Sequence, residues 1–342
     1  MHYRSTHEQR LERWLGPIQV NKLQHAMHHW YGPPIRIINC PGDLMIHRGG
    51  DVTGSIAGGT FSSLSDIIAE ASAGKMRQFF WKKAGATGVV GVTNSLWGLG
   101  SVPASGANAS AAPGGDAPTD ATLGAIPFTN PTSPDTQHVV SAMCAGSVVN
   151  NTLLLYDRLF QVNKTMNDTN TEAVTGVPTR YQNTVGGSVD SAEGNFLFVE
   201  VGGTALAATA HNWTVCLYTD QAGSASTLPS LTGNASAIVR RLDHPVQEWF
   251  AALADGDTGI LALTQMQCSA LVATGVINFV IGHPLVWMPS ATIVNVVWLQ
   301  DYINTAFNLV RVFDDAALAM LEIIKPATTA TTYNANVTTV AG

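Results

Sequence analysis

The sequence contains few charged residues. Asp, Glu, Lys and Arg make up 12% of its 342 residues, against roughly 25% in an average soluble protein. This scarcity excludes a coiled coil or long helical bundle, which is rich in Glu, Lys and Leu, and an intrinsically disordered chain, which carries far more charge. The net charge of -7 also argues against a duplex DNA reader, because such a protein needs a concentrated basic face.

The missing charge has two readings. A soluble domain normally stays dispersed through its surface charge, whereas the core of a protein interface is depleted in charged residues. The chain is therefore either covered by partner proteins or a secreted β-protein with a surface of Ser, Thr and Gly. Composition alone leaves both readings open.

Motifs of common enzymes are also absent. The chain contains no GxSxG nucleophile elbow, no GxxxxGK[ST] phosphate loop and no HExxH zinc motif. We therefore expect no enzymatic activity, no cofactor and no metal. The cysteines form no CxxC pair and have apolar neighbours, so we expect free buried thiols. They are Cys40, Cys144, Cys216 and Cys268.

Signals for secretion and membrane insertion are missing as well. Residues 1–14 are charged throughout and hold no apolar run, which argues against a signal peptide. The longest uncharged stretch, residues 258–300, is long enough to cross a bilayer, but glutamine, asparagine, histidine and proline residues interrupt it. We expect consecutive buried strands there, and no membrane partner.

The charges that are present are unevenly distributed. Residues 1–83 carry a net charge of +4 and residues 84–342 a net charge of -11. We expect an N-terminal anchoring segment with short helices at 1–83, an extended neutral loop region at 84–137 and a β-sandwich domain at 138–342. The basic segment would bind an acidic partner surface. The loop 98–136 and the uncharged tail 326–342 would reach neighbouring subunits.

Alternating apolar residues and turn signals predict many short strands. The expected strands are 35–38, 79–81, 138–144, 153–160, 196–201, 213–219, 237–242, 260–270, 276–281, 293–299, 307–313 and 318–324. A short helix follows Ser62 or Ser63 and ends at Gly74. This pattern favours a mainly β fold, with a β-sandwich or jelly-roll body and an N-terminal segment that is partly helical and loop-rich.

Three groups of polar residues resemble a metal site, a catalytic dyad and a calcium-binding loop, but each lacks part of what such a site requires. His25, His28 and His29 share a helical spacing, but no carboxylate or cysteine stands beside them to complete a metal site. Asp243 and His244 are adjacent, and neighbouring residues do not face each other in a strand, so we expect a loop rather than a catalytic dyad. Asp255 and Asp257 lack the remaining calcium ligands, so we expect a turn there.

The pattern of residues 81–342 resembles virion proteins that tailed bacteriophages encode among their head genes. The resemblance covers about three quarters of the chain and depends on the order of short motifs. These are Ser95–Trp97, Ala111–Gly115, Phe128–Pro131, the LLLYDRL run Leu153–Leu159, Tyr218–Gln221, and Leu263–Ala270 after Gly256–Gly259. The resemblance implies a structural protein of the phage particle and carries over no enzymatic residues.

We therefore expect a virion protein that associates with itself, a trimer being one such state, and with other capsid proteins. It would be a capsid shell, cement or decoration subunit, without specific binding to nucleic acid. Trp14, Trp30 and Trp97 are expected at subunit contacts as aromatic anchors. Asp157 and Arg158 interrupt an apolar strand, where an unpaired buried charge is costly, so we also expect them at an interface.

Other classes of function stay open at this point. A carbohydrate-binding β-sandwich module, on a virion or free, would use exposed tryptophan and acidic loops, and Trp249 is its test residue. A tail protein or another structural part of the virion is a further alternative. A hydrolase is the third class, without a motif in its favour.

Overall fold

The computed structural model describes residues 61, 63–85, 87, 89–149, 151–289, 293–303, 309–325 and 328–342. Two compact units make up the chain, residues 1–55 with 63–65, and residues 56–62 with 66–342. The second unit contains every strand of the described part. The predictions for Trp14, Trp30, Cys40, the three histidines at 25–29 and the segment 35–38 lie outside the described residues.

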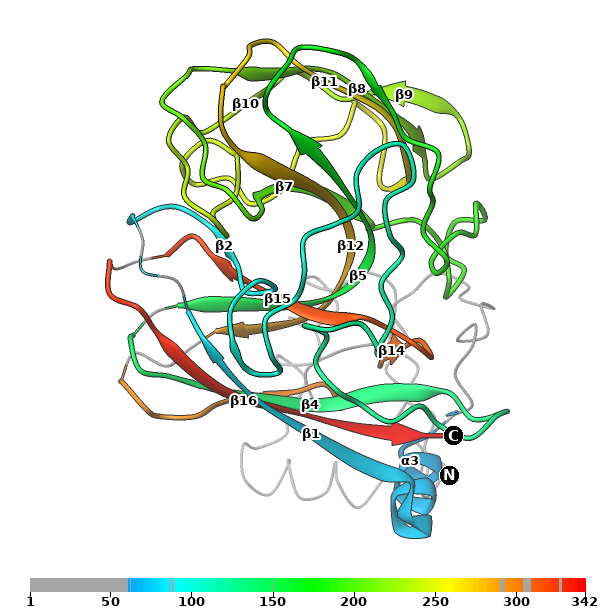
Figure 1. Cartoon of the computed structure of the whole chain (residues 1–342). Helices are drawn as coiled ribbons and strands as arrows, with labels where there is room; N and C mark the ends of the chain where they lie inside the picture. Colours follow the sequence, from blue (N-terminus) through cyan, green and yellow to red (C-terminus); the bar gives the residue numbers. More distant parts are fainter. Residues whose placement is uncertain are drawn as a thin grey trace, which may run out of the picture. The chain divides into compact units, whose positions relative to one another are not determined.

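The fold is mainly β, as the sequence predicts, and the strands paired among the described residues run antiparallel (Figure 1). Sheet 1 has the order β13 (Trp298–Asp301), β4 (Gln137–Gly146), β16 (Thr332–Ala341), β1 (Met76–Ala84), β3 (Ser101–Val102), and β14 (Val310–Val312) also pairs with β4. Sheet 2 has the order β2 (Asn94–Ser95), β15 (Leu318–Ile323), β5 (Thr152–Thr165), β12 (Val276–Pro289), β7 (Phe196–Val201). Sheet 3 has the order β10 (Leu231–Thr232), β8 (Asn212–Asp220), β11 (Ile260–Cys268), β6 (Glu172–Ala173), with β9 (Ala225–Thr227) on β8.

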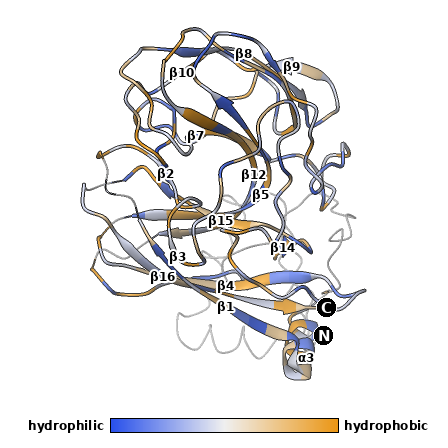
Figure 2. Cartoon of the chain, in the orientation of Figure 1, coloured by the Kyte–Doolittle hydropathy of each residue, from blue (hydrophilic) through white to orange (hydrophobic). Residues whose placement is uncertain are grey.

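Strands β5 and β12 join two sandwich cores because each is fourteen residues long and packs on a different sheet in each half. Leu153 and Leu155, early in β5, pack with Val337 of sheet 1. Leu159, later in β5, packs with Trp213 of sheet 3. Register shifts between β5 and β12 separate the two halves, and such bulges bend a strand and re-aim its side chains. Much of β12 is itself strongly hydrophobic (Figure 2).

The expected helix forms as α3 (Leu64–Glu70), followed by the single π-helical turn η1 (Ala71–Lys75). Gly74 has a positive φ of 82°, the left-handed conformation in which glycine commonly ends a helix. Some expected strands form only in part or not at all. Of the strand expected at 307–313, the described residues form β14 (Val310–Val312). Residues 237–242 form no strand because Arg240 has a φ of 79°, and Asn295, with a φ of 60°, restricts the strand expected at 293–299 to β13.

Two segments expected to reach neighbouring subunits belong to the fold of their own chain. Most of the tail 326–342 forms β16, which lies between β4 and β1 in sheet 1 (Figure 1). In the loop region, the buried Ile126 donates its backbone N–H to Leu318 at 2.8 Å, and Asp116 forms a backbone bridge with Gln161. Backbone groups of an uncharged segment must find hydrogen-bond partners wherever it is buried, and here its own sheets supply them.

Candidate functional site

Sheet 1 turns one face toward sheet 2 and exposes apolar side chains on the other. In β1, Phe79 and Trp81 are buried while Phe80 between them is exposed, because successive strand residues point to opposite faces. Across the sheet, Phe80 lies opposite Asn336, Asn336 opposite Met143, and Met143 opposite Leu299. One transverse row therefore carries three apolar side chains from β1, β4 and β13.

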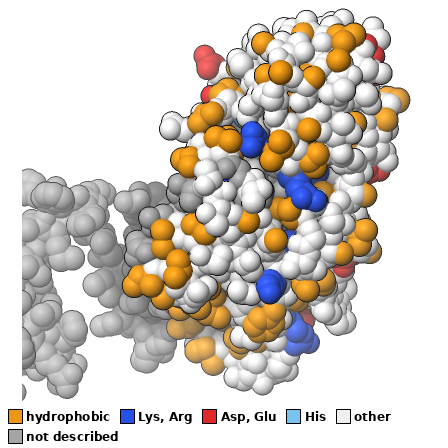
Figure 3. Space-filling model, turned by 60° about the vertical axis from the view of Figure 1, so that its left-hand side comes forward, with side chains coloured by type: hydrophobic (Ala, Val, Ile, Leu, Met, Phe, Trp, Pro, Cys, Tyr) orange, Lys and Arg blue, Asp and Glu red, His pale blue; other side chains and the backbone are white. Residues whose placement is uncertain are grey.

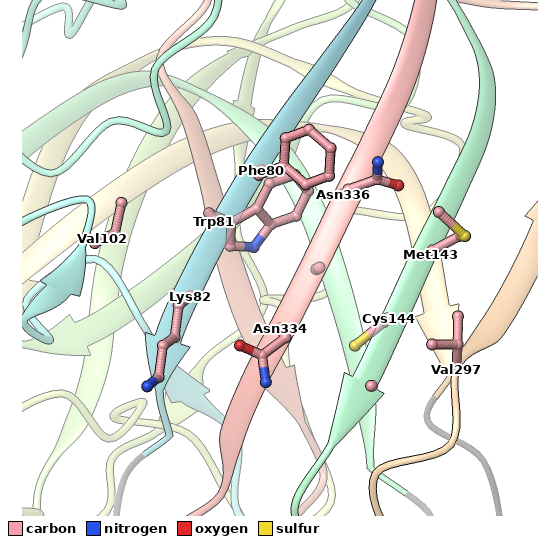
Figure 4. A pocket seen from close by; sticks show the side chains of 11 residues that line it. Phe80, Trp81, Lys82, Val102, Met143, Cys144, Val297, Asn334 and Asn336 are labelled. Atoms are coloured by element: carbon pink, nitrogen blue, oxygen red, sulfur yellow. The ribbon is translucent and has the colours of Figure 1, made fainter.

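An open hollow of about 460 Å³ lies on this outer face (Figure 4). The exposed fraction is 65% for Phe80 and 56% for Val102 on one side of the hollow, and 54% for Val297 on the other. Among the described residues that line it, Lys82 is the one that carries a charge. Contiguous exposed apolar surface of this kind marks interaction sites in soluble proteins.

The amide of Asn336 lies in the middle of this face. The residue is 4% exposed, and neither its oxygen nor its nitrogen has a hydrogen-bond partner within the described chain. An enclosed polar group without a partner costs about 1–3 kcal/mol. We name the surface formed by Phe80, Val102, Met143, Val297 and Leu299 around this amide the outer apolar face. The side of the molecule in Figure 3 is mostly white and orange, with few charged side chains.

Trp97, Asp157 and Arg158 do not lie at the surface, so the interface role expected for them is wrong. All three are buried within their own chain. Arg180 donates from Nε and Nη2 to the two carboxylate oxygens of Asp157, each at 2.8 Å. Asp157 also accepts the backbone N–H of Ala317 at 2.9 Å. The charge that interrupts the apolar strand is thus paired internally.

Arg158 forms the second buried ion pair. Its Nη2 donates to Glu200 Oε1 at 2.6 Å, its Nη1 to the Tyr156 hydroxyl at 3.2 Å, and its Nε to Gln161 Oε1 at 2.7 Å. The guanidinium carbon lies 4.7 Å from the centre of the Trp97 ring, within cation–π distance. Burial alone would raise the pKa of Glu200, but the charge of Arg158 and the side-chain hydrogen bonds from Arg158, Ser95 and Asn278 together outweigh it and lower the pKa overall.

Asp243 pairs with His211 and not with its neighbour His244. His211 Nε2 lies 3.0 Å from Asp243 Oδ2, and its Nδ1 lies 3.0 Å from the Thr209 carbonyl oxygen. The Trp213 indole donates to the same Asp243 oxygen at 2.9 Å. Both ring nitrogens of His211 are therefore occupied, which leaves none to accept a proton from a nucleophile.

His244 plays a structural part instead. Its Nε2 accepts the backbone N–H of Val199 at 2.9 Å, and burial lowers its pKa to about 4. The neutral ring is thus the form that the fold requires. The expectation that Asp243 and His244 are no catalytic dyad agrees with this geometry.

The acidic turn at Asp255 and Asp257 accepts hydrogen bonds from hydroxyl groups of the same chain. Asp257 accepts hydrogen bonds from the Tyr218 hydroxyl and, at 2.8 Å, from Ser226 Oγ. Within the described part of the chain, no group of three or more His, Cys, Asp or Glu is placed to hold a metal ion. Cys144, Cys216 and Cys268 are free and buried, as predicted.

Among the residues described, no helix combines the length and the apolar character needed to span a membrane.

Trp249, the test residue for carbohydrate binding, belongs to an aromatic cluster. Its ring centre lies 5.3 Å from that of Phe196, 4.6 Å from that of Phe250 and 5.4 Å from that of Trp287. Phe196 and Trp287 meet it edge to face, a favourable packing geometry for aromatic rings. Trp249 is partly buried in this arrangement, so its ring contributes to packing.

No protein-family model matches this chain. The search of curated proteins also returned no match. Among solved structures, one chain from "Structure of infectious bursal disease virus Gt strain" aligns over 78% of this chain and 80% of its own length. The two sequences are 10% identical and the TM-score is 0.17, a likeness too low to carry an argument about fold or function.

Proposed function

We propose that this chain is a structural subunit that associates with copies of itself through the outer apolar face. The observation that carries the proposal is the exposure of Phe80, Val102 and Val297 around a hollow whose described lining has Lys82 as its sole charged residue. Interface cores are depleted in charge and enriched in aromatic residues and methionine. Burying this face against a second copy removes apolar surface from water at about 25 cal/mol per Å².

We assign this subunit to a bacteriophage virion, in which it would serve as a capsid shell, cement or decoration protein. A tail protein is the alternative. The order of short motifs shared with phage head-gene proteins and the scarcity of charge support the assignment. The partners on this reading are copies of the chain and other capsid proteins, without a membrane and without specific nucleic acid. We also propose that the chain is not an enzyme. Its buried ionisable side chains pair with each other, His211 with Asp243 and Arg158 with Glu200.

Self-association is tested by native mass spectrometry and light scattering on the purified full chain. We expect an oligomer for the wild type and a shift toward monomer for Phe80→Glu, because the new charge would have to be desolvated in the interface. The matched control is Val185→Glu, since Val185 is also 65% exposed but lies outside the outer apolar face. Equal oligomer mass in Phe80→Glu and wild type would overturn this interface, as would equal loss in both variants.

The virion assignment is tested separately by mass spectrometry of purified phage particles from a host that expresses the chain. We expect the chain in the particle fraction in many copies per particle, as a shell or decoration subunit requires. Its absence from purified particles would overturn the assignment while leaving self-association intact.

A further inference from the structure

A second, polar hollow lies apart from the outer apolar face and shares none of its lining residues. It measures about 260 Å³ and is bounded by β2, β7, β12 and the segments around residues 97–108 and 239–240. Its polar lining includes Ser95, Asn108, Glu200, Arg240 and Asn278.

Asn278 lines this hollow, and one side of its amide has no hydrogen-bond partner among the described residues. The residue is 1% exposed, and its Nδ2 donates to Glu200 Oε1 at 3.0 Å. That bond fixes the amide orientation and leaves Oδ1 as a buried acceptor without a partner among the described residues. Arg240, on the same hollow, has an enclosed Nε–H that likewise lacks an acceptor there. An occupant of the hollow would therefore have to donate a hydrogen bond to Asn278 Oδ1 and accept one from Arg240 Nε–H.

The charges around the hollow narrow the chemistry of its occupant. Arg158 already neutralises Glu200 at 2.6 Å, so the carboxylate does not call for a cation. A simple anion would satisfy Arg240 but has no hydrogen to donate to Asn278 Oδ1. A hydroxyl group both donates and accepts, so neighbouring hydroxyls on one molecule meet both needs.

The polar side chains of the hollow pack closely on Gly202, so a side chain at this position would displace them. A Cβ built there would lie 2.9 Å from Asn108 Oδ1, and 3.2 and 3.3 Å from the two amide atoms of Asn278. Opposite this glycine, the backbone of Arg240 is held at a φ of 79° by bonds of 2.8 Å to Val201 and Ser95. The backbone of Arg240 is therefore held in position before any ligand arrives, which lowers the entropic cost of ordering it on binding.

We propose that this hollow binds a small polyhydroxylated molecule of the size of one sugar ring. Its volume is below the range of about 300–1,000 Å³ found for pockets that bind drug-sized ligands, so a longer oligosaccharide would enter with one residue only. Arg158 covers one face of Trp97, and recognition here uses hydrogen bonds rather than stacking on that ring. The site is independent of self-association and of the virion assignment.

The test is saturation-transfer NMR on the full chain with glucose, galactose, mannose and N-acetylglucosamine, each alone, followed by titration of any sugar that binds. We expect binding of at least one sugar and a loss of affinity of tenfold or more in Gly202→Ala. The matched control is Gly100→Ala, since a Cβ at Gly100 meets nothing within 4 Å, and its affinity should stay within twofold of wild type. Arg240→Gly is the second variant, because glycine adopts the positive φ without strain, and it should also weaken binding.

Four outcomes overturn the proposal. The first is no signal from any of the four sugars, which would leave the hollow to water. The second is equal affinity in wild type and Gly202→Ala, and the third is binding of inorganic phosphate without any sugar. The fourth is a signal lost in Trp249→Ala but kept in Gly202→Ala and Arg240→Gly, which would place the sugar at the aromatic cluster.

Discussion

Replacing Arg158 by methionine tests whether the LLLYDRL strand carries its charges for internal pairing. Methionine keeps much of the side-chain length and fills irregular space, so the change removes the guanidinium and little volume. It abolishes the bonds to Glu200, Tyr156 and Gln161, which measure 2.6–3.4 Å. Glu200, 4% exposed, then remains as a buried carboxylate without its cation.

The size of the effect follows from that uncompensated charge. Breaking a buried ion pair by removing one partner costs about 3–5 kcal/mol. Asn278 still donates to Glu200 Oε1 at 3.0 Å, which places the expected loss toward the lower end of the range. Since natural domains unfold with roughly 5–15 kcal/mol, the loss is a large share of the total stability.

The assay is urea unfolding of wild type, Arg158→Met, Glu200→Leu and the double variant, followed by tryptophan fluorescence and circular dichroism. With a slope of about 1–3 kcal/mol per molar urea, Arg158→Met should lower the midpoint by roughly 1 M or more. The double variant leaves no unpaired charge, so its loss should be smaller than the sum of the single losses by about 2–3 kcal/mol.

Two results would refute this reasoning. One is an Arg158→Met variant within about 1 kcal/mol of wild type, which would show that the pair is not buried in the folded chain. The other is wild-type stability together with a smaller oligomer, which would return Arg158 to a subunit interface. Light scattering on the same samples separates the two.

Further predictions concern pH and packing. Burial lowers the pKa of His138 and His244 to about 4, below an unfolded value of about 6.5, so their stabilisation is present above pH 6.5 and lost as the pH falls toward 4. Each neutral ring should account for about 3 kcal/mol of lost unfolding free energy at pH 4, measured by urea unfolding at several pH values, and a flat profile would contradict this. Gly106→Ala should cost about 1–3 kcal/mol in thermal unfolding, because the new Cβ would lie 2.4 Å from the Trp97 ring. Gly114→Ala, with nothing within 4 Å, should match wild type.

Strand positions could be predicted where turn residues bound a short apolar run. The segment 196–201 is predicted at its observed bounds as β7, and the uncharged stretch 258–300 contains β11 and β12. The pattern failed at 237–242, where the apolar residues are right for a strand but Arg240 adopts a positive φ. Sequence periodicity reports burial, and it does not report backbone conformation.

The outer apolar face left a weak signal in the sequence. Phe79, Phe80 and Trp81 are consecutive aromatic residues, and a strand must place one of the three on the face opposite to the other two. The remaining residues of the face come from β3, which lies near β1 in the sequence, and from β4 and the segment that ends in β13, which are far from β1 in the sequence. Only the strand register brings them beside Phe80.

Composition and alternation by themselves determined the class of this protein: a mainly β chain of low charge, with buried free thiols and acidic turns. They could not determine where the charges of the LLLYDRL run find partners, because Arg180 and Glu200 are 23 and 42 residues distant from Asp157 and Arg158. Nor could they show that the uncharged tail is a central strand, since an uncharged segment suits a subunit contact and a buried strand equally well. Pairing between distant segments decides both, and such pairing exists only in the tertiary structure.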